Sequence, residues 1–267
     1  MQKKFALTNE TRIFNNKTLY RIKALRDFDD VKAGQLGGFI EKENNLSHDG
    51  NCWVYDNALV LSPAHIYENA KIFNKAIIMG NVYGNAHVYD SARVYANAHV
   101  YDNAHLSYNA WVYHQARVYG NAKLSGSARI HGNAEVYDYA VVSGAAKIYG
   151  KVYGRASVGC HAEIKGFVYG NAKVSGSACI YDGAHIFDKA RVYGKAVVYK
   201  DVKIYGNARV YENAMIYEKV EIYDDACVSN RSIIAEGVKI YGNAALKEKK
   251  IFREDVCSND AISEKAA

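Results

Sequence analysis

The sequence predicts an all-β fold, a triangular parallel β-helix in which very short strands stack into three sheets. A six-residue phrase carries this prediction: Ala, any residue, Val or Ile, Tyr, Gly or Asp, Asn, recurring from residue 53 to residue 246. The phrase is shortened at only three places. The 267 residues also include 23 Tyr and a single Pro, a composition that argues against Pro-rich linkers and low-complexity disorder.

Each six-residue repeat encodes one short strand and one corner. In Ala98-His99-Val100-Tyr101-Asp102-Asn103, Ala98 and Val100 lie two residues apart and therefore share one face of an extended chain, while His99 and Tyr101 share the other. Asn tolerates left-handed backbone, so we expect it to form the corner. Such a unit buries its apolar face only by stacking on copies of itself, which predicts a solenoid with a thin core of Ala, Val and Ile.

The shortened repeats indicate how many sides each coil has. The aliphatic marker recurs about 34 times between Val54 and Leu246, and three of its steps measure four residues instead of six: Ile78 to Val82, Ile148 to Val152, and Ile164 to Val168. The numbers of repeats between these steps are multiples of three. Three repeats per coil therefore place every shortened corner on the same edge of a triangular prism of about eleven coils.

The repeat resembles that of the hexapeptide-repeat, left-handed β-helix family, with Tyr or Ser where that family often has Gly. The segments Asp27–Gly34, Gly37–Ile40 and Asn51–Asp56 are similar to the start of YdcK-like repeat proteins of bacteria and phages, whose function is uncharacterised. The left-handed twist is implied by this resemblance. The resemblance also implies, as an alternative, a CoA-dependent acyltransferase in which a His acts as general base at an inter-subunit site. The phage members of this group suggest a role in host–phage conflict.

The two ends of the chain depart from the repeat. We expect residues 1–52 to form an N-terminal β cap with a hairpin turn at Asn15-Asn16-Lys17, because the open end of a solenoid exposes core and strand edges. Residues 53–247 are expected to form the β-helix, and residues 248–267 a C-terminal cap and tail. The cap is either purely structural or a partner-binding head.

Composition excludes several classes of protein. No apolar run approaches the ~20 residues of a membrane span, and the N-terminus lacks the apolar region of a secretory signal, so we expect a cytoplasmic protein without membrane association. Five Cys without a CxxC pair predict neither a disulfide framework nor a zinc site, and we expect no metal and no cofactor. A repeat region without Thr excludes an ice-binding ladder, and a net charge of +6 excludes an acidic DNA mimic.

One side of the predicted prism carries an aromatic residue in every coil. We call this column the tyrosine ladder; its members are Tyr67, Tyr83, Tyr101, Tyr119, Tyr137, Tyr153, Tyr169, Phe187, Tyr205, Tyr223 and Tyr241. The corresponding columns of the other two sides are interrupted by Ser, Gly, Leu or Lys. Stacked Tyr could serve only to stiffen the solenoid, but that argument applies equally to all three sides, so a binding role for the ladder stays open beside it.

The neighbouring column mixes cations, His and anions, and it includes Arg117, Lys151 and Lys203. Cations between aromatic rings can bind nucleotides or single-stranded nucleic acid, and a Tyr surface can contact glycans, but two Glu interrupt the stripe and the net charge is modest. The simplest prediction is a homo-oligomer formed through the tyrosine ladder, acting as a non-enzymatic binding or scaffolding protein. The ligand or macromolecular partner is not identified by any residue.

The alternative as an enzyme rests on exposed histidines. His99 and His185 are the candidates for a general base, because they project outward beside the ladder. No orienting partner lies at a fixed spacing from either, and the repeats contain no inserted loop that would wall a pocket.

Overall fold

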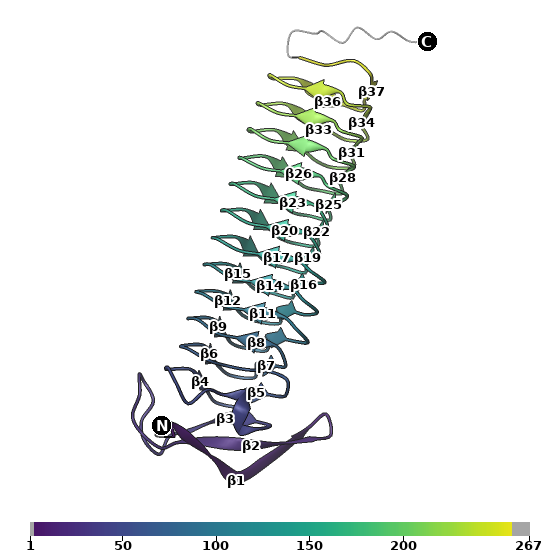
Figure 1. Cartoon of the computed structure of the whole chain (residues 1–267). Coiled ribbons are helices and arrows are strands. Elements are labelled where there is room, and N and C mark those ends of the chain that lie inside the picture. Colours follow the sequence, from purple (N-terminus) through teal and green to yellow (C-terminus); the bar gives the residue numbers. More distant parts are fainter. Residues whose placement is uncertain (1–2, 258–267) are drawn as a thin grey trace. The chain divides into compact units, whose positions relative to one another are not determined.

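The computed structural model describes residues 3–257, and the chain divides into two compact units, Met1–Gly144 and Ala145–Ala267. Both units are all-β, and each contains about six turns of a parallel β-solenoid with three sheets per turn (Figure 1). The predicted fold class is therefore confirmed. In the part of the chain that the structure describes, no helix has the length and apolar character needed to cross a membrane.

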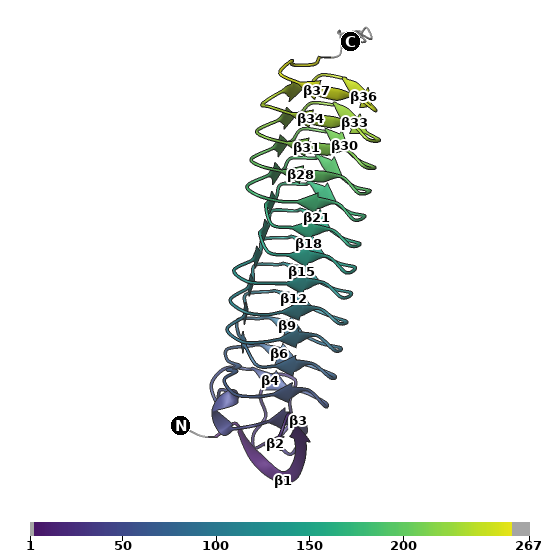
Figure 2. The same cartoon turned by 90° about the vertical axis from the view of Figure 1, so that its right-hand side faces the viewer.

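The first unit begins with antiparallel strands that lead into the three sheets of the solenoid. The hairpin sheet holds β1 (Phe5–Phe14), β2 (Lys17–Ala24), β3 (Leu36–Ile40), β5 (Leu59–Val60), β7 (Ile77–Ile78), β10 (Arg93–Val94), β13 (Trp111–Val112) and β16 (Arg129–Ile130). The tyrosine sheet holds β8 (Asn81–Val82), β11 (His99–Val100), β14 (Arg117–Val118) and β17 (Glu135–Val136). The third sheet, seen in Figure 2, holds β4 (Trp53–Val54), β6 (Lys71–Ile72), β9 (His87–Val88), β12 (His105–Leu106), β15 (Lys123–Leu124) and β18 (Val141–Val142).

The second unit repeats the same three-sided arrangement. The strands that correspond to the hairpin sheet are β19 (Lys147–Ile148), β22 (Glu163–Ile164), β25 (Cys179–Ile180), β28 (Val197–Tyr199), β31 (Met215–Tyr217), β34 (Ile233–Ala235) and β37 (Lys250–Phe252). Its tyrosine sheet holds β20 (Lys151–Val152), β23 (Phe167–Val168), β26 (His185–Ile186), β29 (Lys203–Ile204), β32 (Glu221–Ile222) and β35 (Lys239–Ile240). Its third sheet holds β21 (Ser157–Val158), β24 (Lys173–Val174), β27 (Arg191–Val192), β30 (Arg209–Val210), β33 (Cys227–Ser229) and β36 (Ala245–Lys247).

The strand register confirms three repeats per coil. His99 pairs with Arg117 in the first unit and Arg191 pairs with Arg209 in the second, and in each case the partner lies three full repeats further along the chain. Coils that contain a shortened corner pair at a smaller separation along the chain, as Ile77 does with Arg93. The inward side of each strand is closed to solvent: the Ala and Val or Ile of the repeats, such as Ala98 and Val100, have 0% exposure.

The corner differs from the sequence prediction in one respect. The residue with left-handed backbone is the one before the Asn: Asp102 has φ 54° and Gly84 has φ 68°. The Asn that follows is free to use its side chain along the column, and Asn85 Nδ2 donates to Asn103 Oδ1 at 3.2 Å. The Ala104 amide donates back to the Tyr101 carbonyl at 3.3 Å, and of the two residues between them only Asp102 has a positive φ. This is the pattern of a type II′ turn, in which the first central residue is the left-handed one.

The ends of the described chain join the solenoid directly. β1 and β2 form an antiparallel hairpin with left-handed Asn15 and Asn16 at the predicted turn. β3 pairs antiparallel with β2 and parallel with β5, so the change to parallel pairing occurs inside the segment 1–52. At the other end, β37 pairs with β34 and Val256 bridges to Ile240. The coil thus continues past residue 247, and residues 258–267 of the expected tail lie outside the described part.

The shortened corners require glycine for a steric reason. A Cβ on Gly80 would lie 2.7 Å from the Ala98 carbonyl oxygen and 2.9 Å from Val94 Cγ1, both in the next coil. One coil later, the corresponding corner is full length and Ala96 occupies left-handed backbone with φ 56°. Position 80 therefore excludes a side chain by steric overlap, whereas position 96 holds a side chain on backbone that favours glycine.

Gly80→Ala is expected to lower the free energy of unfolding by about 1–3 kcal/mol, because the added methyl group overpacks the corner. The matched change, Ala96→Gly, is expected to raise it slightly, because left-handed backbone costs a non-glycine residue roughly 1–2 kcal/mol and the flexibility of Gly offsets only part of this. Urea unfolding followed by circular dichroism measures both. Equal stability of Gly80→Ala and the wild type would contradict the steric account.

Candidate binding face

The tyrosine ladder forms in both units as a column of stacked rings. In the first unit, Tyr67, Tyr83, Tyr101, Tyr119 and Tyr137 follow one another with ring centroids 4.6–4.9 Å apart and ring planes within 7° of parallel. In the second unit, Tyr153, Tyr169, Phe187, Tyr205, Tyr223 and Tyr241 do so at 4.8–5.3 Å and within 8°. From Tyr67 to Tyr137 and from Tyr153 to Tyr241, each coil contributes one ring, as the sequence predicted.

The ladder arises from the register of the tyrosine sheet. The residue after each buried Val or Ile points outward, and parallel pairing without slippage places these residues one above another. The other sheets carry only short stacks, such as Tyr193 with Tyr211 at 4.9 Å and Tyr199 with Tyr217 at 5.2 Å. The position below Tyr193 is Ser175, which ends that stack.

Stacking determines which part of each ring is available for contact. All eleven residues are half-buried, because each ring inside the column has neighbours against both of its faces. A sugar or a base would find no open ring face there. The surface that the ladder presents therefore consists of ring edges and phenol hydroxyls at the spacing of the coils, about 4.8 Å.

The hydroxyls of the ladder are neutral at physiological pH. Burial raises the pKa of Tyr67 and of Tyr119 to about 12, from the ordinary value of 10.0. Burial also raises the pKa of Tyr83, Tyr101 and Tyr169. Each phenol can therefore both donate and accept a hydrogen bond, and the ladder carries no charge of its own.

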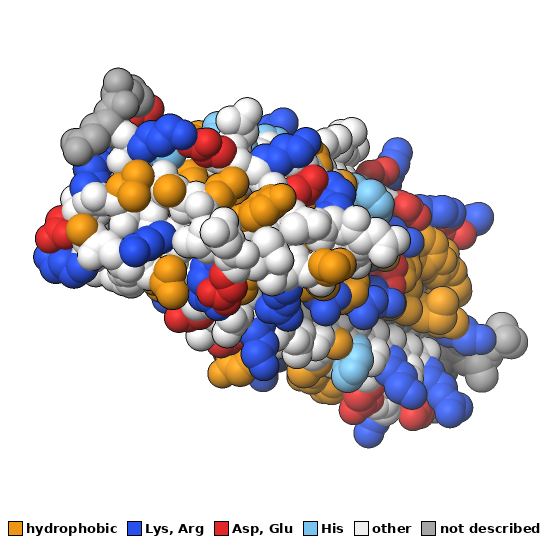
Figure 3. All heavy atoms as spheres, turned by 90° about the horizontal axis from the view of Figure 1, so that it is seen from below, with side chains coloured by type: hydrophobic (Ala, Val, Ile, Leu, Met, Phe, Trp, Pro, Cys, Tyr) orange, Lys and Arg blue, Asp and Glu red, His pale blue; other side chains and the backbone are white. Residues whose placement is uncertain are grey.

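The three cations predicted beside the ladder lie in the neighbouring column, but they do not form a continuous basic stripe. Arg117 is exposed and pairs in register with Glu135. Lys151 is exposed, and Lys203 Nζ lies 3.5 Å from Glu221 Oε1 in an ion pair. On the face that Figure 3 shows, basic and acidic side chains are likewise interspersed.

The two histidine candidates lie edge-on to ladder rings. His99 meets Tyr83 at 6.1 Å and 86°, and His185 meets Tyr169 at 6.0 Å and 89°. Burial, followed by the charges of Arg117 and Lys203 respectively, lowers the pKa of each imidazole. Both are therefore neutral at physiological pH, as a general base must be. Among the described residues, neither ring hydrogen-bonds to a carboxylate that would orient it.

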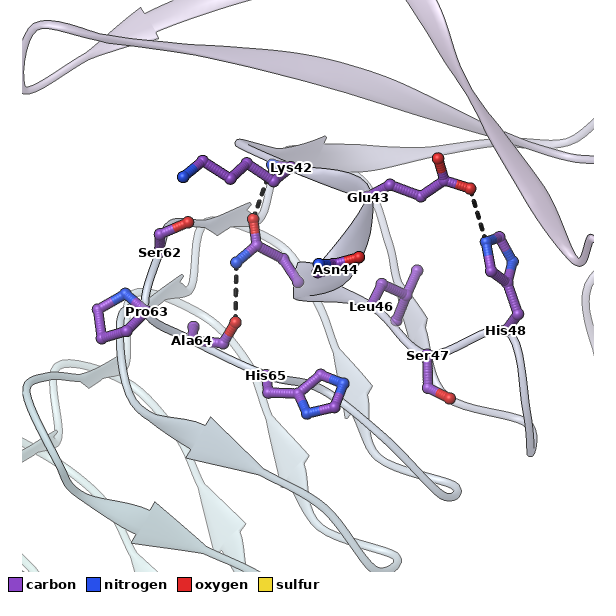
Figure 4. A pocket seen from close by; sticks show the side chains of 11 residues that line it. Lys42, Glu43, Asn44, Leu46, Ser47, His48, Ser62, Pro63, Ala64 and His65 are labelled. Atoms are coloured by element: carbon purple, nitrogen blue, oxygen red, sulfur yellow. Dashed lines mark hydrogen bonds and ion pairs between the residues drawn. The ribbon is translucent and has the colours of Figure 1, made fainter.

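Two clefts beside the N-terminal strands were not predicted from the sequence. One, of about 660 Å³, lies between the 3₁₀ turn η1 (Glu43–Asn45) and the corner at Ser62–His65 (Figure 4). Asn45 fixes its shape: Oδ1 accepts from the Lys42 amide and Nδ2 donates to the Ala64 carbonyl, each at 2.8 Å. No periodic signal marks this cleft, because the segment that faces the corner at Ser62–His65 comes from outside the repeat. Within residues 3–257, no group of three or more His, Cys, Asp or Glu is placed to hold a metal ion.

Comparison with known proteins bears on the solenoid repeat. Residues 202–218 match the family model described as the YdcK beta solenoid repeat. Residues 202–218 are thus similar to this family's repeat. The chain is also similar to the protein of Escherichia coli (strain K12) named "uncharacterized acetyltransferase YdcK", with 41% identity over 76 residues, which is 25% of this chain and 23% of that protein. The chain thus spans less than a quarter of the length of this relative, and the predicted resemblance to YdcK-like proteins is confirmed.

The matched segment, residues 202–218, contains two complete corners, Gly206-Asn207 and Glu212-Asn213, and one ladder ring. Val202 and Ile204 are buried in it at 0% exposure, and Tyr205 stacks between Phe187 and Tyr223. The family match therefore describes the residues that build the core and the ladder. It supplies no activity.

Raising the pH above the range of ordinary phenols should destabilise the solenoid. Because the folded pKa of Tyr67 and Tyr119 lies above the unfolded value of 10.0, their contribution is fully present below pH 10 and is lost as the pH rises toward about 12. Thermal unfolding between pH 8 and 12, with phenol ionisation followed by ultraviolet absorbance, measures this. The variant Tyr67→Phe/Tyr119→Phe should lose less stability over the same interval, and an identical loss would contradict the assignment.

Proposed function

We propose that the protein is a non-enzymatic binding or scaffolding protein that self-associates through the tyrosine ladder. The observation that supports this is the column itself: an unbroken run of half-buried aromatic rings in each unit, one ring per coil from Tyr67 to Tyr137 and from Tyr153 to Tyr241, on one sheet only. A column kept for stiffness alone would serve equally on any of the three sides. Tyr combines an apolar ring with a polar hydroxyl, so it suits a surface that is buried in the oligomer and exposed to water in the separate subunit.

A second copy matches the ladder better than an unrelated partner because it has the same spacing. Ring edges and hydroxyls recur with the coils, at centroid separations of 4.8–5.0 Å from Tyr153 to Tyr205. Two such columns stay in step along their length when they meet, as a two-fold symmetric interface requires. The neutral phenols can pair as donor and acceptor, so the contact buries no unpaired charge.

The neighbouring column can add specificity to this contact. Lys203 and Glu221 are one coil apart and of opposite charge. If the two-fold axis passes between the coil of Lys203 and the coil of Glu221, Lys203 of one copy lies opposite Glu221 of the other. The ion pair within each chain is then joined by ion pairs between the two chains. Such charges at the edge of an interface affect orientation and association rate more than affinity.

Self-association can be tested with two matched tyrosine variants in the second unit. Tyr205→Asp places a charge in the ladder, whereas Tyr193→Asp places the same charge in the short stack of the third sheet. Light scattering should show an oligomer for the wild type and for Tyr193→Asp, and a smaller species for Tyr205→Asp at the same concentration. A monomeric wild type, or equal masses for the two variants, would contradict the proposal; circular dichroism verifies that both fold.

A second candidate function is CoA-dependent acyl transfer, which the name of the similar E. coli protein favours. The neutral imidazoles of His99 and His185 could act as a base if a second copy supplied the walls of a site, because each lies beside the ladder. The imidazole would take the proton of an acceptor amine or hydroxyl as this group attacks the thioester carbonyl; the acyl C–S bond would break, and the proton would pass to the departing CoA thiolate.

Acetyl-CoA should raise the melting temperature of the wild type if this second function is present. His99→Ala or His185→Ala should then remove the rise, while His161→Ala, a substitution outside the ladder side, should leave it unchanged. A melting temperature that does not respond to acetyl-CoA, or a response that survives both ladder-side substitutions, argues against acyl transfer at these residues.

A further inference from the structure

From the hairpin sheet of the first unit, we infer a second site, independent of the tyrosine ladder, that binds a small organic phosphate with an aromatic body. The site is a cleft of about 480 Å³ where the tip of the β1–β2 hairpin meets the outer side of β5, β7 and β10. Its lining residues are Arg12, Phe14, Asn57, Leu59, Lys75, Ile77, Ser91 and Arg93. This volume is in the range of small-molecule sites.

The floor of the cleft is apolar because of two exceptions to the repeat. The outward position of a solenoid strand is usually polar, but β5 and β7 carry Leu59 and Ile77 there, with exposures of 3% and 9%. They belong to a hydrophobic cluster with Leu19 and Phe39, against which Phe14 of the hairpin packs. These side chains are already largely covered, so an apolar body that enters the cleft would gain its contact mainly from the half-buried Phe14 ring and the exposed edge of Ile77.

Three cations surround this floor: Arg12 from the hairpin, Lys75 from the corner before β7, and Arg93 from β10. In the described part of the chain, none of the three forms an ion pair with a carboxylate. The nearest corner carboxylates do not line the cleft, and each accepts a backbone amide of the next coil: Asp56 from Asn74 at 3.0 Å and Asp90 from Tyr108 at 2.9 Å. The cleft lining itself thus holds three cations and no carboxylate, which favours an anionic ligand.

Arg93 is held in place by a ring and not by an acid. Its guanidinium lies 4.8 Å from the Trp111 ring, and Arg129 lies 5.3 Å from the same ring. This contact limits the movement of the guanidinium. Among residues 3–257 its N–H groups have no hydrogen-bond partner, and a planar guanidinium can bind two oxygens of a phosphate. Because three cations surround the cleft, a phosphate group, with nearly two negative charges at neutral pH, is favoured over a singly charged carboxylate. The apolar floor with Phe14 beside it favours an aromatic body over a sugar alone.

The experiment uses 1-naphthyl phosphate as the probe and the fluorescence of Trp111 as the readout. Trp111 stacks on Arg93, whereas Trp53, the other Trp of the chain, is buried at 0% exposure. The probe should change the fluorescence saturably, and Trp111→Phe should abolish the change. Inorganic phosphate and 1-naphthol should each bind at least about tenfold more weakly, because each lacks one half of the interaction.

Substitution of the cations separates this site from general attraction to a basic protein. Arg93→Gln and Lys75→Gln should each weaken binding about tenfold, whereas Arg209→Gln, an exposed Arg on β30 of the second unit, should leave it unchanged. Lys75→Gln is the variant that should disturb the fold less, because Lys75 is exposed at a corner, whereas Arg93 packs against the Trp111 ring.

Three results would overturn the inference: no saturable binding of 1-naphthyl phosphate by the wild type, equal binding of inorganic phosphate, or equal loss in Arg209→Gln. Binding of a single-stranded oligothymidylate without binding of 1-naphthyl phosphate would also overturn it, in favour of nucleic acid on the strip that runs from Arg93 to Arg129. Failure of the self-association test leaves this inference untouched, because the two surfaces share no residue.

Discussion

The closed packing of Ala against Val, Ile or Leu inside each coil is the constraint on which the other features depend. These side chains have almost no exposure along the solenoid, so a strand cannot slip by one residue without turning its buried side toward water. Each coil must therefore contain three repeats, or three with one corner shortened, and successive coils must align. A strand of two residues has no stability of its own, and it exists because it is held between identical neighbours.

This constraint converts a sequence repeat into a surface. Once the inward residues are fixed, the residue after each of them projects outward at one ring per coil, and stacking at 4.9 Å between Tyr101 and Tyr119 follows from the register. The stacked rings add an attraction of roughly 0.2–1 kcal/mol per pair, which is small beside the core. The ladder is thus a consequence of the coil and not its cause, which leaves its edges and hydroxyls available to a partner.

The sequence predicted the features that repeat and missed those that do not. We could predict the three-sided coil, the buried Ala and Val, and the ladder, because the residues that form them recur in the sequence of every coil. The left-handed corner residue was misassigned to Asn, since residue preferences alone do not distinguish adjacent positions in a turn. The contacts of the N-terminal strands had no such signal: Lys4 is fully buried and its Nζ donates to the Cys52 carbonyl at 2.9 Å, a contact between segments far apart in the chain. The clefts lined by Arg12 and Lys42 arise from the same kind of long-range contact.

Disulfide trapping in solution tests the three-repeat coil most directly. In a background in which Cys160, Cys179, Cys227 and Cys257 are replaced by Ser, the pair Tyr101→Cys/Tyr119→Cys places two thiols in adjacent coils of one sheet, three repeats apart in the chain. The pair Tyr101→Cys/Tyr113→Cys places them closer in the chain, only two repeats apart, but on different sides of the coil. The coil predicts rapid and complete oxidation of the first pair and none of the second, as measured by mass spectrometry; oxidation of the second pair in preference to the first would contradict it.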